Sequence, residues 1–586
     1  MSPSDASPPH SPARRPWAVF VVVLLGVLLH APSLGGGFYA DDHMHQLALD
    51  GKLPLKPWAL YDFGGFDDWA HLQETVGGFP WWTSPDWKIR FFRPLSSVLL
   101  WLDHSLWGGN AAAYHAVSLL WLAALLLGAQ RLYRALGLER GVALGAVALL
   151  ASSQATLYPT DWIANRNSLS AAVFIVAAAA TLASHQRLGR NRALFGAWIC
   201  SALACLSKES GVVAFAVLAA YLALFEHGLP RAWARRAILV ACVSAALFVV
   251  GLALAGYGSR SAFYATPWSD PLRFGEHLGL LATVGSLSLL TPVASDLVFV
   301  APAAVPALVV AGSFLGVAFV VWARRRLRGD RRAAFLFAWT VLALLPEAGA
   351  PTQDRLLLTA TIGFAGGLSL LLARTLRGEP RRSRFERAVA WTFVVLASLE
   401  ALSTLGLSAA TAQMAGKLRE QIVAADVGAR ELGRRDVVVL QADDPLVAFT
   451  LPATWALQTD DVDVHFTILQ TGRRALRWTR IDERTMEFES LDRPFVTDPF
   501  ETVYRSSDAA IPVGSAFTSD GLRVEVTRTD EDGGVRAFRV KFEEAPEGPS
   551  HRFLAPVAGR LTDIAAPAPG QSIDLPEAPP AHPFVP

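Results

Sequence analysis

Residues 17–46, WAVFVVVLLGVLLHAPSLGGGFYADDHMHQ, join an apolar segment directly to a pair of adjacent aspartates. The apolar part, residues 17–34, approaches the length of about 20 residues that a helix needs to cross a bilayer. A signal peptide is the alternative, but the apolar run is long and no convincing small-residue cleavage site follows it. Because more apolar blocks follow, we interpret residues 17–34 as an uncleaved first span of a polytopic helical membrane protein.

The composition of the whole chain agrees with that interpretation. Of 586 residues, 52% are hydrophobic and 18% are charged, and the apolar residues cluster in blocks. These figures exclude a water-soluble enzyme. The net charge of +1 shows no basic excess of the kind that nucleic-acid binding requires, so no nucleic-acid partner is expected.

The apolar blocks alternate with Arg-rich and with mixed-charge loops, which predicts about eleven transmembrane helices. The Arg-rich loops place the N-terminus in the cytoplasm and the long first loop outside. Residues 278–291 are also apolar, but a full span there would turn the later Arg-rich loops outward, so we expect a re-entrant or interfacial helix. The expected spans lie near residues 17–34, 112–130, 141–158, 168–186, 193–207, 211–226, 237–255, 303–323, 333–346, 356–373 and 388–407.

The character of the sequence changes after about residue 410, where charged residues become frequent. DVVVLQ (436–441) reads as a strand, and GLRVEVTRT (521–529) with GVRAFRVKF (534–542) reads as a hairpin. The domain prediction is a disordered cytoplasmic leader (1–15), a membrane domain (16–410), an extracytoplasmic α/β or β-rich domain (411–545) and an irregular Pro-rich tail (546–586).

Asp41 and Asp42 stand where the first span leaves the membrane. Adjacent carboxylates raise each other's pKa, or they need a cation, a donor group or a substrate nearby. A carboxylate there could accept a proton from an acceptor hydroxyl or amine. The alternative is a pair of solvated loop carboxylates.

Other polar residues interrupt the apolar sequence near the predicted outer ends of later spans. Each has a structural alternative, such as membrane anchoring, a salt bridge or a side chain that reaches out to solvent. All of them face the same side in the predicted topology, and together they predict one polar cavity suited to an acceptor and an anionic, lipid-linked substrate. The residues are Arg93, His115, Asp161, Arg166, Lys208, Glu209, Asp354 and Arg355.

Five motifs occur in a characteristic order: DDH (41–43), FRPL…LDHSLWG…YH (92–115), WIANRNSL (162–169), LSKESG (206–211) and QDRLLL (353–358). This order resembles the membrane part of the transmembrane O-mannosyltransferases that carry tetratricopeptide repeats. More broadly it resembles the glycosyltransferases of the C-type (GT-C) fold, over about residues 17–410.

The resemblance implies transfer of a sugar from a polyprenyl-phosphate-linked donor to a lipid, protein or glycan acceptor on the outer face, next to membrane lipids. It implies that Asp41 is the general base or orients the acceptor, with Asp42 at the second acidic position. Other cavity candidates are His43, His115, Asp161, Glu209 and Asp354. The basic positions that would neutralise the donor phosphate are Arg93, Arg166, Lys208 and Arg355.

The chain also departs from these relatives. The tetratricopeptide repeats are absent, and three leucines follow Arg355 where an aromatic-rich run is usual. A transporter or lipid flippase is the alternative function. It would be expected to show two related halves and broken helices at mid-membrane depth, and the sequence has no such symmetry.

No metal ligand is assigned. His43 and His45 lie beside the aspartates and could bind a divalent cation, but no His and carboxylate cluster demands one.

Overall fold

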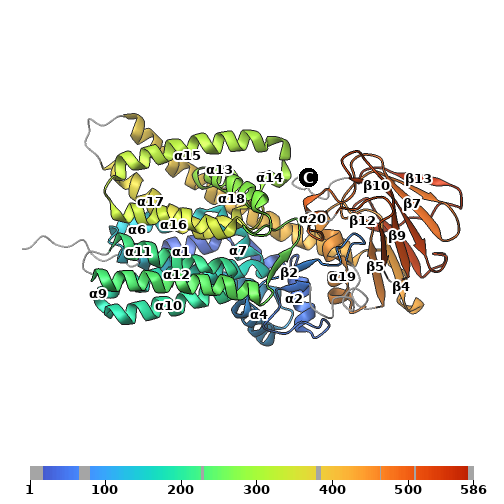
Figure 1. Ribbon diagram of the computed structural model, residues 1–586, viewed down its shortest axis with the longest axis horizontal. Coiled ribbons are helices and arrows are strands. Elements are labelled where there is room, and N and C mark those ends of the chain that lie inside the picture. Colours follow the sequence, from blue (N-terminus) through green and yellow to red (C-terminus); the bar gives the residue numbers. More distant parts are fainter. Residues whose placement is uncertain are drawn as a thin grey trace, which may run out of the picture.

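The computed structural model describes residues 17–64, 79–225, 230–377, 384–461, 463–506, 510–519 and 521–578. A bundle of helices occupies one part of the molecule, and a β-rich region built from the C-terminal part of the chain caps one end of it (Figure 1). The predicted leader, residues 1–15, lies outside the described residues.

The bundle contains helices of very different length. Six of the described helices are long and apolar enough to cross a membrane, or seven if α6 and its bent continuation Gln154–Asp161 form one span. The predicted number of eleven is therefore not confirmed by length and composition. The bundle helices are α1 (Trp17–Leu29), α5 (Ala111–Ala135), α6 (Arg140–Ser152), α7 (Leu157–Asp161), α8 (Arg166–Ala183), α9 (His185–Leu188), α10 (Arg190–Ser207), α11 (Val213–Leu224), α12 (Arg231–Leu254), α13 (Pro271–Leu290), α15 (Val305–Leu327), α16 (Arg331–Glu347), α17 (Leu358–Leu376) and α18 (Arg384–Val423).

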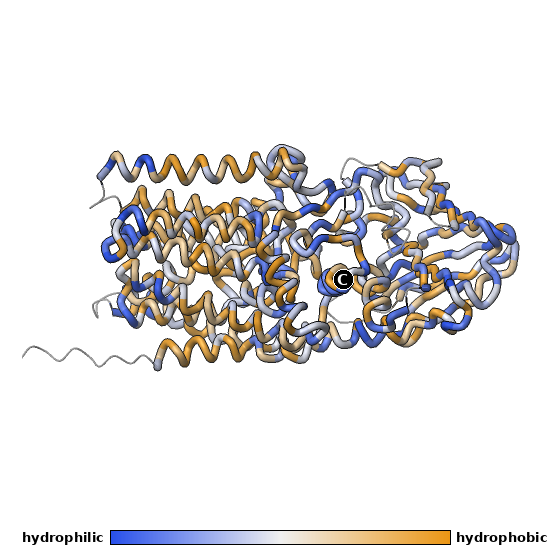
Figure 2. The backbone as a smooth tube through the Cα atoms, turned by 90° about the horizontal axis from the view of Figure 1, so that it is seen from below, coloured by the Kyte–Doolittle hydropathy of each residue, from blue (hydrophilic) through white to orange (hydrophobic). Residues whose placement is uncertain are grey.

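The outer helices of the bundle show that the protein is integral to a membrane. Only 11% of the most apolar window of α12 and 6% of that of α15 are buried inside the protein. By contrast, 94% of the corresponding window of α17 is buried, so α17 forms the centre of the bundle. Figure 2 shows the hydrophobic residues along the bundle helices. Apolar surface of this extent, on helices long enough to cross a bilayer, indicates contact with lipid.

The apolar segment 278–291 lies within α13. Helix α12 ends and α15 begins at the same end of the bundle (Figure 1), so the chain between them returns to the end from which it started. Helix α13 packs closely on α15, where a Cβ at Gly312 would lie 2.1 Å from the carbonyl oxygen of Thr283. The glycine permits this close approach.

The C-terminal region contains two sheets. In the first, β4, β5 and β11 are parallel and β12 is antiparallel, in the order β12-β11-β4-β5. The second is antiparallel, in the order β13-β6-β7-β10-β9-β8. Their bounds are β4 Arg435–Val439, β5 Val464–Ile468, β6 Leu476–Arg480, β7 Thr485–Ser490, β8 Ala516–Ser519, β9 Leu522–Thr529, β10 Val535–Phe542, β11 His551–Val557, β12 Arg560–Asp563 and β13 Ser572–Leu575.

The strand and hairpin expected in this region are present. Strand β4 starts one residue before the predicted strand, and the predicted hairpin is β9 paired with β10, with Phe538 opposite Val526. The tail differs from the expectation, because β11, β12 and β13 lie in the segment predicted to be irregular. Its prolines concealed a strand that pairs with β4, far away in the sequence, and long-range pairing of this kind leaves little local signal.

The two parts are joined along α18 and α19 (Pro445–Thr459). Helix α18 continues to Val423, beyond the domain boundary expected at 410. Helix α19 packs on α18 and on the short helix α2 (Asp42–Leu49). Apolar residues of α18, of α19 and of the turn before α2 share one core, which includes Tyr39, Ile422 and Leu451. The C-terminal region is thereby held against the segment that follows the first helix.

The short elements at this end of the bundle complete the fold. Strands β1, β2 and β3 form a small antiparallel sheet from segments far apart in the chain. These elements are η1 (Ala31–Gly35), β1 (Asp62–Gly64), β2 (Lys88–Arg90), α4 (Pro94–Trp107), η2 (Gln154–Thr156), η3 (Ile163–Asn165), η4 (Glu209–Val212), β3 (Gly258–Arg260), α14 (Leu297–Val300), η5 (Pro302–Ala304), η6 (Asp354–Leu357), η7 (Arg430–Leu432) and α20 (Pro499–Thr502).

One buried ion pair makes the stability of the C-terminal region testable. The guanidinium of Arg474 is fully buried and binds the Glu501 carboxylate through two hydrogen bonds, of 2.5 and 2.6 Å. Replacing Arg474 with methionine is expected to destabilise the region by about 3–5 kcal/mol, because it leaves Glu501 buried and unpaired. Limited proteolysis and thermal unfolding of the full chain measure this effect.

The matched control is Arg477→Met, which removes an exposed ion pair with Asp574. Exposed pairs of that kind contribute little to stability, so this variant should unfold almost as the parent does. Equal effects of the two substitutions would contradict the prediction.

Candidate functional site

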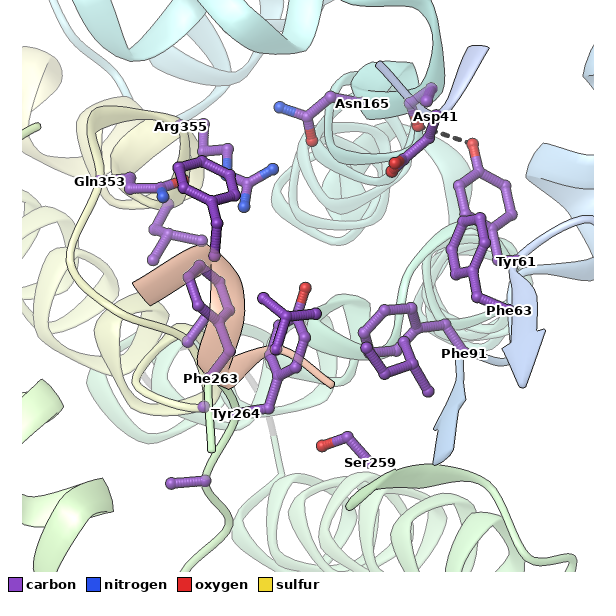
Figure 3. Close-up of a pocket in the computed structure, with 18 of the residues that line it drawn as sticks. Asp41, Tyr61, Phe63, Phe91, Asn165, Ser259, Phe263, Tyr264, Gln353 and Arg355 are labelled. Atoms are coloured by element: carbon purple, nitrogen blue, oxygen red, sulfur yellow. Dashed lines mark hydrogen bonds between the residues drawn. The ribbon is translucent and has the colours of Figure 1, made fainter. Parts of the chain in front are cut away.

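A cavity of about 1300 Å³ lies where the bundle meets the C-terminal region. Residues at the ends of several helices line it, and Figure 3 shows Asp41 and Arg355 directed toward the same space. Helix ends suit polar side chains, because these positions lie away from the hydrocarbon-facing middle of the helices. Five predicted site residues line the cavity: Asp41, Arg93, Lys208, Glu209 and Arg355.

The Asp41 carboxylate faces the cavity without a hydrogen bond from any residue that the structure describes. Asp41 is the N-cap residue of α2, and its backbone carbonyl accepts a hydrogen bond from the N–H of His45. Burial raises the pKa of Asp41 to about 6, although the charges of Arg355 and Arg93 act in the opposite direction. The carboxylate is therefore ionised at neutral pH and able to take up a proton.

Asp42 is turned away from this cavity. Its carboxylate is 1% exposed and accepts hydrogen bonds from the backbone N–H groups of Tyr39, at 2.9 Å, and Ala164, at 2.6 Å. Successive positions at a helix start differ in direction by about 100°. Asp42 thus ties α2 to the segment before α8, and it does not stand beside Asp41 in the cavity as the sequence led us to expect.

The cations in the cavity differ in whether they are paired. The Nε of Arg93 lies 3.0 Å from Oε2 of Glu209, and the Nζ of Lys208 lies 2.9 Å from Oε2 of Glu347. Arg355 has no ion pair among the described residues, and its Nε is buried without a partner. Its guanidinium lies 5.2 Å from the centre of the Trp162 ring. Arg355 is therefore a guanidinium available to an anionic ligand.

Arg166 does not line the cavity, contrary to its expected place among the phosphate-binding residues. It is buried, forms an ion pair with Asp103 and donates to the carbonyl oxygen of Tyr114 at 3.2 Å. The salt bridge considered as the alternative is the arrangement found.

Four other candidates are buried, do not line the cavity and bind other groups. Asp161 binds His30 at 2.8 Å, and His115 binds the carbonyl oxygen of Gly37 at 2.9 Å. The ring of His43 is directed to the carbonyl oxygen of Ala40.

The remaining one, Asp354, accepts hydrogen bonds from the hydroxyls of Ser288, at 2.6 Å, and Ser295, at 2.7 Å. Its backbone N–H donates to Asp296, which lines the cavity. Asp354 thus holds the loop after α13 against the segment that carries Arg355.

The part of the chain that the structure describes contains no group of three or more His, Cys, Asp or Glu side chains arranged to hold a metal ion. Burial lowers the pKa of His45 to about 3, so this ring is neutral, and it packs on Tyr61 and Phe63. These contacts assign His45 to the packing of the first loop.

Several lining residues were not among the sequence candidates. Tyr61 donates a hydrogen bond to the carbonyl oxygen of Ala164, the contact drawn in Figure 3. The C-terminal region contributes Asp444 and Arg473. One signal was available, because the pair Asp443–Asp444 follows an alanine just as the pair Asp41–Asp42 does. The repeated pair does not by itself predict a shared cavity, because only the folded structure brings the two segments together.

No family model matches the chain, and no curated protein matches it. Several solved structures are similar. The Archaeoglobus fulgidus oligosaccharyltransferase tethered with an acceptor peptide shares 13% identity with a TM-score of 0.42, over 75% of this chain and 63% of that one. ArnT from Cupriavidus metallidurans in the apo state shares 13% identity with a TM-score of 0.40, over 75% and 84%.

ArnT has also been solved bound to undecaprenyl phosphate, with 14% identity and a TM-score of 0.35 to this chain. These neighbours are membrane glycosyltransferases of the C-type fold. The sequence motifs resemble the same class. The chain spans less than two thirds of the archaeal oligosaccharyltransferase.

Proposed function

We propose that the protein is a membrane glycosyltransferase that moves a sugar from a polyprenyl-phosphate-linked donor to an acceptor. The observation that carries the proposal is an unpaired carboxylate, Asp41, and an unpaired guanidinium, Arg355, that face one cavity at the end of a membrane bundle. A base and an anion-binding cation are the two groups that such a transfer requires.

The topology belongs to the same proposal. The N-terminus is cytoplasmic, and the cavity with the C-terminal region lies outside the cytoplasm. The helices α1, α10, α11 and α16 also cross, and with the seven candidate spans they complete about eleven passes. Residues 16–410 form the membrane domain, and residues 411–545 form most of the domain that covers the cavity.

The apolar wall of the cavity supports a lipid-linked donor. The wall includes Phe248 and Leu252 of α12 and Phe274 of α13. Most of the surface of α12 is not covered by other parts of the protein. A polyprenyl chain can therefore lie along α12 in contact with lipid while its phosphate reaches Arg355. Arg93 and Lys208 also place positive charge near the phosphate, but each is already paired with a carboxylate, Glu209 or Glu347.

The proposed step is a direct displacement. Asp41 takes the proton of the acceptor nucleophile, which forms a bond to the anomeric carbon of the donor sugar. The bond between that carbon and the phosphate oxygen breaks, and the electron pair leaves on the lipid phosphate. Arg355 stabilises the developing negative charge there. The configuration at the anomeric carbon is inverted.

The activity should depend on pH through Asp41. Only the ionised carboxylate accepts a proton, so kcat/KM should rise with pH through about 6 and level off above about 7. Below pH 6, kcat/KM should fall about tenfold per pH unit. Initial rates across pH 5–8 in constant ionic strength measure the profile, and a rate independent of pH over this range would contradict the role of Asp41.

The function itself is tested with purified protein in lipid nanodiscs and a panel of polyprenyl-phosphate sugars labelled in the sugar. Mass spectrometry of glycans and glycolipids from cells with and without the protein identifies the product. Transbilayer movement of the labelled lipid without any transfer of its sugar would favour a flippase and overturn the proposal.

A further inference from the structure

The C-terminal region presents a crevice to the cavity at the ends of two parallel strands. Strands β4 and β5 run parallel, with α19 connecting them, and the segments that follow their carboxyl ends contain Asp444 and Arg473. Both residues line the cavity. In open α/β sheets, ligands bind outside the carboxyl ends of the strands.

Two buried polar atoms at this crevice have no partner. Oδ1 of Asp444 accepts a hydrogen bond from the N–H of Leu446 at 2.7 Å, but its Oδ2 is buried and unpaired, and the residue is 1% exposed. The Nε of Arg473 is buried and unpaired as well. Its Nη2 lies 3.5 Å from a carboxylate oxygen of Glu577, which is longer than a hydrogen bond. Groups of this kind are costly unless a ligand or water satisfies them.

The crevice lies close to Asp41. Helix α19, which Asp444 caps, packs on α2, which Asp41 caps. Tyr39, Asp41 and Asp444 all line the same cavity. A molecule held by Asp444 and Arg473 therefore lies in the cavity that the Asp41 carboxylate faces.

The chemistry of the crevice favours a neutral sugar. Asp444 and Arg473, with Asp498 and Arg493 beside them, bring equal numbers of carboxylates and guanidiniums. The rings of Phe449 and Tyr504 lie 6.2 Å apart on the same lining. Hydroxyls both donate and accept hydrogen bonds, and a sugar ring also offers an apolar face that packs on aromatic side chains.

An extended peptide fits this lining less well. Such peptides commonly bind by adding a strand to an exposed sheet edge. The cavity-lining residues of the C-terminal region that the structure describes all lie outside strands β4 to β13.

We propose that Asp444 and Arg473 form the acceptor subsite, and that it binds an uncharged, hydroxyl-rich saccharide with one hydroxyl directed to Asp41. The inference rests on the proposed transferase function and names its acceptor class. The subsite belongs to the C-terminal region, whereas the donor site belongs to the bundle.

The test measures binding rather than turnover. The full chain in nanodiscs is probed with arrays of neutral oligosaccharides, anionic oligosaccharides and peptides, and hits are measured by saturation-transfer NMR. Asp444→Asn keeps a good helix cap but loses the charge. We expect it to weaken binding of a neutral oligosaccharide about 10- to 100-fold. Asp443→Asn is the matched control, because Asp443 binds Gln421 outside the cavity and should leave binding unchanged.

Binding of undecaprenyl phosphate is measured in parallel, so that this inference and the proposed function can fail separately. Loss of saccharide binding in Asp444→Asn with undecaprenyl phosphate binding retained supports the subsite. Undecaprenyl phosphate binding without saccharide binding by the parent chain overturns the subsite and leaves the transferase function standing. Selective binding of peptides, or of anionic oligosaccharides, also overturns it.

Discussion

Replacing Asp41 with asparagine is expected to lower sugar transfer by about 10²- to 10⁴-fold, the range that a general base contributes. The reason is that asparagine fills the same space but cannot accept the acceptor's proton. The carboxylate has no hydrogen bond from the described residues, and the backbone contact of Asp41 to His45 is kept. Folding and donor binding should therefore remain. Transfer of labelled sugar, with thermal unfolding of the same sample, measures both quantities.

Asp42→Asn is the informative control for this prediction. The Asp42 carboxylate accepts from two backbone N–H groups, one on each oxygen, and an amide can accept through only one of its two terminal atoms. This variant should lose stability, and any activity that remains should show an unchanged pH profile. Full transfer by Asp41→Asn would remove Asp41 from the mechanism.

Replacing Arg355 with methionine is expected to lower the transfer rate by about 10²- to 10³-fold, and to weaken binding of undecaprenyl phosphate. Arg355 lines the cavity and has no ion pair among the described residues, so its charge is free to act on the phosphate. Arg355→Lys should recover part of the rate, because it restores the charge but not the planar fork. Isothermal titration with undecaprenyl phosphate and single-turnover transfer separate binding from chemistry.

Arg166→Met provides the contrast. Arg166 pairs with buried Asp103 outside the cavity, so this substitution should destabilise the protein without a specific loss of lipid phosphate affinity. A normal affinity and rate in Arg355→Met, or a selective loss of affinity in Arg166→Met, would show that the phosphate binds elsewhere.

The two aspartates show how far sequence reasoning reaches at the candidate site. Adjacent carboxylates after an apolar segment predicted a polar site at the end of the first helix, and Asp41 does face the cavity. The direction in which α2 starts decides which of the two carboxylates faces the cavity. Moving along the helix by one residue changes the direction of the side chain by about 100°. Arg166 and Arg355 differ in the same way. Both stand at the start of a buried helical segment, but Asp103 pairs with Arg166 and no described carboxylate pairs with Arg355.

The sequence by itself determined the membrane character, the strand at β4 and the β9–β10 hairpin. Each of these follows from local composition and periodicity, because lipid or the adjacent strand selects residue types at short range. Only the tertiary structure decided that β11 completes the parallel sheet, that Asp444 and Arg473 reach the cavity, and that Arg355 has no ion pair among the described residues. These depend on contacts between residues that are hundreds of positions apart, and pairing and burial at that distance are set by packing rather than by neighbours in the chain.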